Sequence, residues 1–331
     1  MSPIISRISQ SFGFGKRKVS SGAAAFSATG GNQTPANGLA PGNGYKYHTF
    51  SSPGTFTVSS GNDTVEYLVV AGGGGGANGG GGGGGGLLSN SFEMPAPTRQ
   101  SPFPVSGPVS YPVVIGGGGS GGLAYPGATD GTQGSPSSFG PVSTTGGGGA
   151  SGGDAGPPGH GNPGGSGGGA STETYGTGPF NPGGAATNYP GSTQQGFPGG
   201  GAYQYSGGNL SAGGGGGAGA AGQDGSPPGA SPRKAGDGGV GLQFPAFTGP
   251  LIGAPALNPL SGYFAGGGGG GGWGNPGGSG GLGGGVAGSG SGITPDASQA
   301  NTGGGGGGSG YPSWVPGGNG GSGIVIIRYL A

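Results

Sequence analysis

Large apolar side chains and charged side chains are both scarce in this sequence, and cysteine is absent. Leu, Ile, Val and Phe together number 48 of 331 residues, and charged residues make up 5% of a chain whose net charge is zero. A single conventional hydrophobic core for a domain of this length is therefore excluded. The absence of cysteine also excludes a disulfide framework and a cysteine-based metal site.

Long apolar segments are missing as well. The apolar stretches 68–70 and 324–327 have the length of strands, and no run approaches the roughly 18 apolar residues of a membrane-spanning helix. The N-terminal residues lack an uninterrupted apolar region, so we expect no signal peptide and synthesis in the cytoplasm. No useful segment has the periodicity of a helix, and we expect essentially no α-helix.

Residues that carry enzyme chemistry are few and scattered. His48 and His160 are the only histidines, and the nine acidic residues occur singly. Matches to G-x-G-x-x-G carry no weight in a chain with 105 glycines and no helix to follow them. Asp224-Gly225 and Asp237-Gly238 predict turns better than calcium ligands. We therefore expect no catalytic, cofactor-binding or metal site, and a protein that is not an enzyme.

Glycine is what the chain has in abundance, and much of it is arranged in uninterrupted runs. Such a run is either a flexible linker or an extended rod in the polyglycine II geometry, a left-handed helix with three residues per turn. No strict Gly-X-Y period is present, which excludes a collagen triple helix. The runs are 72–76, 79–86, 116–119, 146–149, 213–217, 266–272 and 303–308.

Free energies show what packed rods would require. Ordering the backbone costs about 1–2 kcal/mol per residue, whereas a net hydrogen bond returns only about 0.5–1.5 kcal/mol. A lattice of rods therefore needs a scaffold that holds both ends of the chain. The runs exclude even serine, which a linker would tolerate, and this purity favours packed rods that cannot accept a side chain. We predict packed rods within 72–323.

The scaffold is predicted from alternating and apolar segments. Residues 45–71 contain three strand patterns separated by turns, and residues 110–115 contain a fourth. Residues 324–330 form the last strand, and their continuous apolar character predicts burial on both faces.

Five segments in a fixed order carry a resemblance to a known family. They resemble the glycine-rich domain of tail-fibre and adhesin proteins of tailed phages. The resemblance implies an all-β fold plus polyglycine II: a small β-sandwich base with an inserted bundle of packed left-handed glycine helices. It covers residues 45–331 and implies a location in the virion. The segments are Tyr47–Val58, Val65–Gly72, Tyr111–Gly116, Ser137–Gly140 and Gly321–Tyr329.

Residues 1–44 precede that domain as a basic arm and linker. Three positive charges give a small footprint for nucleic acid, so we expect no nucleic-acid partner. A short peptide that docks onto other virion proteins, with its aromatic residues as anchors, is the favoured interpretation. The docking residues would be Ile4, Ile5, Ile8, Phe12, Phe14, Lys16, Arg17 and Lys18.

The densest group of aromatic residues falls in a glycine-poor stretch between runs. These side chains either seal the ends of the rods or form exposed loops that contact a host-surface glycan or outer-membrane protein. The residues are Tyr175, Phe180, Tyr189, Phe197, Tyr203 and Tyr205.

The leading hypothesis is a non-enzymatic virion structural protein of the tail-fibre or adhesin type. It would dock by its N-terminus and present loops for attachment to the host surface. The alternatives are a purely structural head-fibre, decoration or tail component without receptor binding, and an ice-binding or matrix glycine-rich protein. A homotrimer is kept as an open oligomeric state.

Overall fold

The computed structural model describes most of the chain. The described residues are 24–123, 127–153, 159–171, 180–188, 193–204, 210–227, 229–254, 261–272, 276–290, 293–310 and 315–331.

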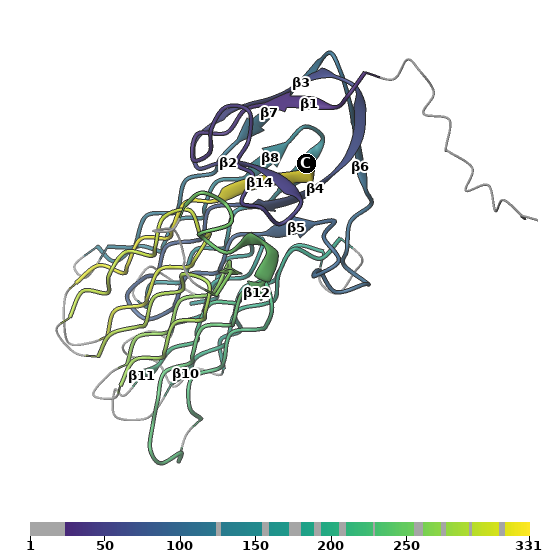
Figure 1. The fold of residues 1–331 in the computed structure, drawn as a ribbon. Helices are drawn as coiled ribbons and strands as arrows, with labels where there is room; N and C mark the ends of the chain where they lie inside the picture. The colour runs from purple at the N-terminus through teal and green to yellow at the C-terminus, as the bar shows by residue number, and fades with distance from the viewer. Residues whose placement is uncertain are drawn as a thin grey trace, which may run out of the picture.

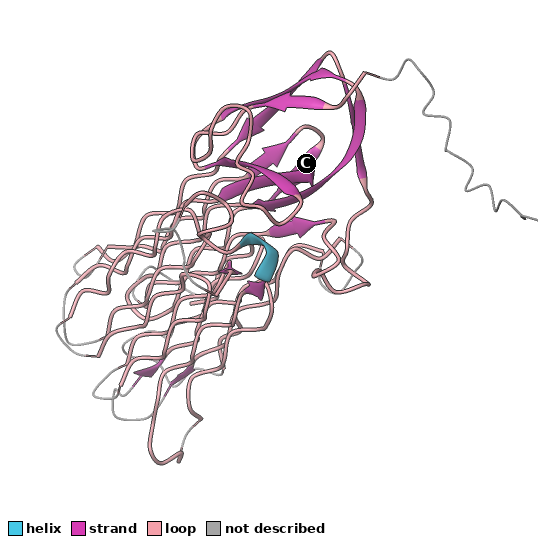
Figure 2. Ribbon diagram, viewed as in Figure 1, coloured by secondary structure: helices cyan, strands magenta, loops and turns pink. Residues whose placement is uncertain are grey.

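Two antiparallel sheets form one end of the molecule (Figures 1 and 2). The first sheet has the order β1-β3-β7-β8-β9, and the second has the order β2-β14-β4-β5, with β6 also paired to β4. Strands β2, β3 and β4 fill the predicted segment 45–71, and β7 and β14 match the other two predictions. The bounds are β1 Ser27–Thr29, β2 Tyr45–Phe50, β3 Gly54–Ser60, β4 Asn62–Val70, β5 Leu87–Ser89, β6 Phe103–Ser106, β7 Val109–Val114, β8 Ser137–Phe139, β9 Val142–Thr144 and β14 Ile324–Leu330.

A hydrophobic core lies between the two sheets. Phe56 and Phe139 of the first sheet pack with Val69 and Ile327 of the second, and all four are fully buried. The rings of Phe56 and Phe139 pack edge to face, with their centroids 5.8 Å apart. The arrangement confirms a sandwich of two packed sheets.

Strand β14 is buried on both faces, as its apolar sequence predicts. Val325 and Ile327 face the core between the sheets, whereas Ile324 and Ile326 face the opposite side. There they pack on a second core that includes Phe244, Phe247 and Phe264. This second core joins the sandwich to the rest of the chain. It is built by the 3₁₀ turn η1 (Pro245–Phe247) and the short strands β12 (Leu242–Gln243) and β13 (Tyr263–Phe264).

The glycine runs extend away from the sandwich as parallel and antiparallel rods (Figure 1). Along 72–77, three successive backbone amides donate hydrogen bonds to three different neighbouring segments. Residues three apart donate to the same segment. A β-strand would alternate with a period of two, whereas a period of three is that of polyglycine II. The pairs are Gly72 N–Ser135 O, Gly73 N–Gly321 O, Gly74 N–Gly83 O, Gly75 N–Thr132 O, Gly76 N–Gly318 O and Ala77 N–Gly80 O, at 2.8–3.1 Å.

Most rod glycines lie too close to a neighbouring rod to accept a side chain. A Cβ added to Gly74 would lie 2.1 Å from the carbonyl oxygen of Gly148. The prediction that the runs pack laterally, backbone to backbone, is confirmed by these contacts. The left-handed sense of the rods stays a prediction.

The sandwich begins earlier than the predicted boundary at residue 45. Strand β1 (Ser27–Thr29) pairs with β3, and Leu39 forms an isolated bridge with Tyr47. Residues 24–44 of the predicted arm and linker therefore belong to the sandwich. A strand of three residues with one buried side chain, Ala28, gives no alternating pattern to detect. The strands β5, β6, β8 and β9 also escaped prediction, because three or four residues are too few to establish a period of two.

Helical structure is confined to η1 among the described residues, which confirms the expected lack of α-helix. In this part of the chain we find no helix with the length and hydrophobicity needed to cross a membrane.

Candidate functional site

The bundle of rods has one end at the sandwich and one end far from it. We call the far end the distal end and define it by strands β10 (Tyr203–Gln204) and β11 (Leu210–Ser211) and by the bridges that link neighbouring rods there (Figure 1). These bridges are Asn78–Ser309, Gly79–Gly152, Asn181–Ala202 and Ser211–Gly272.

Two of the predicted surface aromatics meet at the distal end. The rings of Phe180 and Tyr203 have centroids 4.8 Å apart and are tilted by 49°. The Phe180 side chain is 42% exposed, whereas Tyr203 is half-buried. Part of Phe180 is therefore accessible to solvent, with the Tyr203 ring packed against it.

Gly201 positions the Phe180 ring. A Cβ on Gly201 would lie 2.1 Å from Cζ of Phe180, so the ring rests directly on the glycine backbone. The amide of the same glycine donates a 2.7 Å hydrogen bond to Oδ1 of Asp224, an exposed residue. An aromatic ring and a carboxylate therefore flank one glycine at the distal end.

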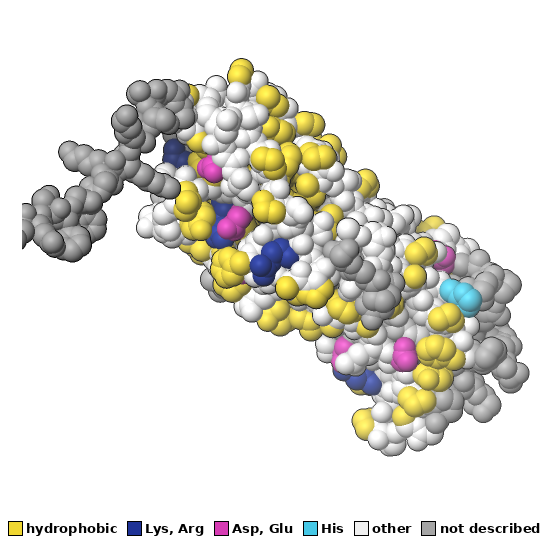
Figure 3. All heavy atoms as spheres, turned by 90° about the vertical axis from the view of Figure 1, so that its right-hand side faces the viewer, with side chains coloured by type: hydrophobic (Ala, Val, Ile, Leu, Met, Phe, Trp, Pro, Cys, Tyr) yellow, Lys and Arg dark blue, Asp and Glu magenta, His cyan; other side chains and the backbone are white. Residues whose placement is uncertain are grey.

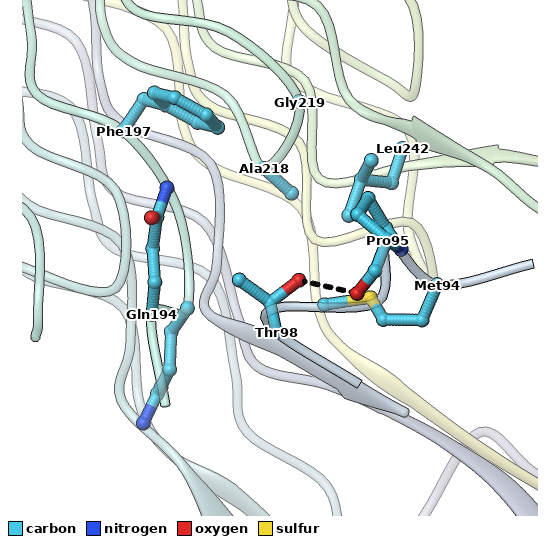
Figure 4. A pocket seen from close by; sticks show the side chains of 9 residues that line it. Met94, Pro95, Thr98, Gln194, Phe197, Ala218, Gly219 and Leu242 are labelled. Carbon is cyan, nitrogen blue, oxygen red and sulfur yellow. Dashed lines mark hydrogen bonds between the residues drawn. The ribbon is translucent and has the colours of Figure 1, made fainter. Parts of the chain in front are cut away.

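Phe197 does not belong to this group. Its amide donates to Gly217 O at 3.0 Å, and its half-buried ring lines a cavity of about 130 Å³ near the sandwich (Figure 4). At about 3.1 Å per residue, the six residues from Phe197 to Tyr203 span roughly 19 Å of rod. Phe197 and Tyr203 are therefore close in the sequence but far apart in space, because the chain between them is extended.

The cavity is lined by apolar and uncharged polar side chains. Its lining includes Met94, Phe197 and Leu242, and the described residues around it include no titratable side chain. The Thr98 hydroxyl is engaged, because it donates to Pro95 O at 3.2 Å (Figure 4).

The remaining predicted site residues lie outside the described part of the chain. These are Tyr175, Tyr189 and Tyr205 of the aromatic group, and Ile4, Ile5, Ile8, Phe12, Phe14, Lys16, Arg17 and Lys18 of the docking arm.

His48 lies inside the sandwich, fully buried. Its Nδ1 is 2.8 Å from Gly30 O, its Nε2 is 3.3 Å from the Tyr329 hydroxyl, and its ring stacks on that of Tyr329. Burial lowers the pKa of this imidazole, with the positive charge of Lys46 acting in the same direction. These contacts indicate a neutral packing residue.

Charged groups are thinly spread over the surface, as Figure 3 shows for one face. No group of three or more His, Asp or Glu side chains that could hold a metal ion occurs among the described residues. Asp224 is the one site residue that sequence analysis assigned only to a turn. Its proximity to Phe180 depends on contacts between separate rods, which no local sequence signal reports.

A family model described as a glycine-rich domain matches residues 48–330, nearly the whole of the predicted 45–331 domain. A search of curated proteins found no matching relative.

Proposed function

The chain belongs to the glycine-rich domain family, and on that premise we propose that it is a virion structural protein of the tail-fibre or adhesin type. In this proposal it has no enzymatic activity. Its N-terminal residues dock onto other virion proteins, and its distal end meets the host surface.

The observation that carries the proposal is the placement of the two ends of the molecule. Strand β1 and the residues just before it lie in the sandwich, where Phe26 packs edge to face on Tyr329 with ring centroids 4.7 Å apart. The exposed Phe180 and its partner Tyr203 lie at the opposite end of the bundle (Figure 1). Anything held by the residues before 24 would therefore leave the distal end free to contact a host.

The rods suit such a role because they form a continuous hydrogen-bonded body. A rod that is hydrogen-bonded to three neighbours at every turn is rigid. It therefore holds the distal end at a fixed distance from the sandwich, which a flexible linker does not. The sequence resemblance to phage tail-fibre and adhesin domains supports the same function.

The main alternative is a structural head-fibre, decoration or tail component without receptor binding. The exposed Phe180 ring, held against Tyr203 and next to the Asp224 carboxylate at the free end, is the feature that favours attachment. An ice-binding or matrix protein would instead present a regular surface array, whereas the described residues of the distal end present one aromatic cluster.

The test uses the phage that encodes the chain. A deletion of residues 2–23 spares β1 and the whole sandwich, so the purified variant should keep its circular dichroism spectrum and unfolding midpoint. We expect the full chain in purified particles by mass spectrometry and immunogold labelling, and we expect loss of the deleted chain from particles.

Two outcomes would refute the proposal. Absence of the full chain from purified particles refutes a virion location, and normal incorporation of the deleted chain refutes N-terminal docking. Substitution of Lys16, Arg17 and Lys18 by glutamine is the matched variant. It shows whether docking depends on charge or on the apolar residues of the arm.

A further inference from the structure

We propose that Phe180, Tyr203 and Asp224 form a subsite for one uncharged sugar ring of a host-surface glycan. The inference rests on the proposed function, because it names the ligand of the distal end. It selects a glycan over a protein as the partner.

The chemistry of the three side chains fits a sugar. The face of an aromatic ring packs against the C–H groups on one side of a pyranose, and a carboxylate accepts hydrogen bonds from the hydroxyl groups at its edge. Phe180 supplies an exposed ring, and Asp224 supplies a carboxylate of which Oδ1 is fixed by the Gly201 amide. Both flank the same glycine, so a ligand of the size of one sugar ring can reach both.

The site is held in place before any ligand arrives. Asn181 and Ala202 exchange two backbone hydrogen bonds, of 3.0 and 2.8 Å, next to Phe180 and Tyr203. The Asn181 side chain also donates to Ser171 O at 2.7 Å. Because the ring rests on Gly201 and Tyr203 supports it, little side-chain entropy is lost when a ligand binds.

Electrostatics favour an uncharged sugar. The Asp224 carboxylate would repel an anionic sugar, and among the nearby cations the Lys234 ammonium is already bound to both carboxylate oxygens of Asp237, at 2.6 and 2.8 Å. A specific protein partner would need a contact surface of about 800 Å² on each side, many times the area of one aromatic ring.

The experiment measures binding of uncharged disaccharides to the full chain by ligand-observed NMR. The probes are maltose, cellobiose, lactose and chitobiose, with sialyllactose as the anionic comparison. We expect at least one uncharged probe to bind and sialyllactose to bind more weakly than lactose.

Variants assign the binding to this cluster. Phe180→Ala should weaken binding roughly tenfold, and Phe180→Tyr should retain it because the ring is kept. Asp224→Asn preserves an acceptor for the Gly201 amide but removes the charge, and it should weaken binding with an unchanged unfolding midpoint. Phe92→Ala is the matched control, because Phe92 is 67% exposed but lies between β5 and β6, beside the sandwich.

Contrary results separate the two proposals. The sugar subsite is refuted if none of the uncharged probes binds, or if Phe180→Ala and Asp224→Asn both bind like the unaltered chain. If these variants reduce adsorption of the phage without any sugar binding, the ligand is a protein, and the proposed function stands. If sugar binding depends on Phe180 but the chain is absent from particles, the subsite stands and the virion function fails.

Discussion

The guanidinium group of Arg328 on β14 forms an ion pair with the carboxylate of Glu66 on the adjacent strand β4. Nε and Nη2 of Arg328 lie 2.9 and 2.5 Å from Oε2 of Glu66, and the two residues are direct partners in the strand register. The Arg328 side chain is only 4% exposed, and its guanidinium also lies 4.3 Å from the centre of the Tyr45 ring. A charge so deeply buried is tolerated because it is paired.

Removal of one partner should be more damaging than removal of both. Glu66→Gln leaves the Arg328 charge buried without its carboxylate, and we expect a loss of about 3 kcal/mol in the free energy of unfolding. The double variant Glu66→Leu/Arg328→Met should lie within about 1 kcal/mol of the unaltered protein. Urea unfolding measures both. Equal losses in the single and double variants would contradict a specific ion pair.

Two glycines should respond in opposite ways to alanine. A Cβ on Gly82 would lie 2.2 Å from Gly74 O inside the bundle, so Gly82→Ala should destabilise the protein by about 3 kcal/mol or more. A Cβ on Gly117 would meet nothing within 4 Å, and its φ lies outside the left-handed range. Gly117→Ala should therefore be neutral or stabilise by about 0.4–1 kcal/mol, through the unfolded state. Similar losses for both variants in urea unfolding would show that rod packing is not the cause.

Backbone amides inside the bundle should exchange slowly with deuterium. Gly82 N donates to Gly306 O and Gly268 N donates to Gly82 O, both at 2.8 Å. We expect exchange at these amides to be slowed by at least about a thousandfold relative to an unstructured peptide. Gly117 is the internal control, because it is exposed and the described residues offer its amide no acceptor. Peptide-like exchange across 79–86 and 266–272 would overturn the rod architecture.

The protein should lose stability as the pH falls below about 6.5, the ordinary pKa of histidine. Burial lowers the pKa of His48 in the folded state, so the unfolded chain binds a proton more readily over the interval between the two values. Stability from this group is complete above the unfolded pKa and is lost as the pH falls towards the folded pKa. The slope is at most about 1.4 kcal/mol per pH unit for one proton.

His48→Gln tests the assignment, because glutamine is polar and does not titrate. Unfolding midpoints between pH 7 and 5 should fall more steeply for the unaltered chain than for this variant. Parallel curves would mean that another group is responsible.

The sequence was most informative where a pattern was local. The alternation in 45–70 and the apolar run 324–327 at the start of the last strand sufficed to predict β2, β3, β4 and β14, and burial of β14 on both faces. The purity of the glycine runs predicted rods without side chains, because a Cβ at most of these glycines would collide with a neighbouring backbone. The short strand β1 was missed because three small residues carry no such pattern.

The edge of the bundle shows what local patterns cannot reveal. In the rod 116–123, the amides of Gly119 and Gly122 donate to the backbone carbonyls of Gly73 and Gly76, whereas other amides donate to side-chain oxygens of neighbouring segments. Thr132 Oγ1 accepts from Ser120 N at 2.7 Å, and Asn319 Oδ1 accepts from Gly121 N at 2.8 Å. Nothing in the sequence near residue 120 identifies Asn319 as its partner.

The amino-acid sequence by itself determined the composition of the fold: strands at both ends of the domain, rods between them and no α-helix, because each follows from the side chains of consecutive residues. Only the tertiary structure decided which rods are neighbours, and therefore which side chains share a surface. Phe180 and Asp224 meet at Gly201, whereas Phe197 lies far along the same rod from Tyr203. The physical reason is that each extended rod bonds to several others through an identical backbone, so its partners depend on the path of the whole chain and not on its own residues.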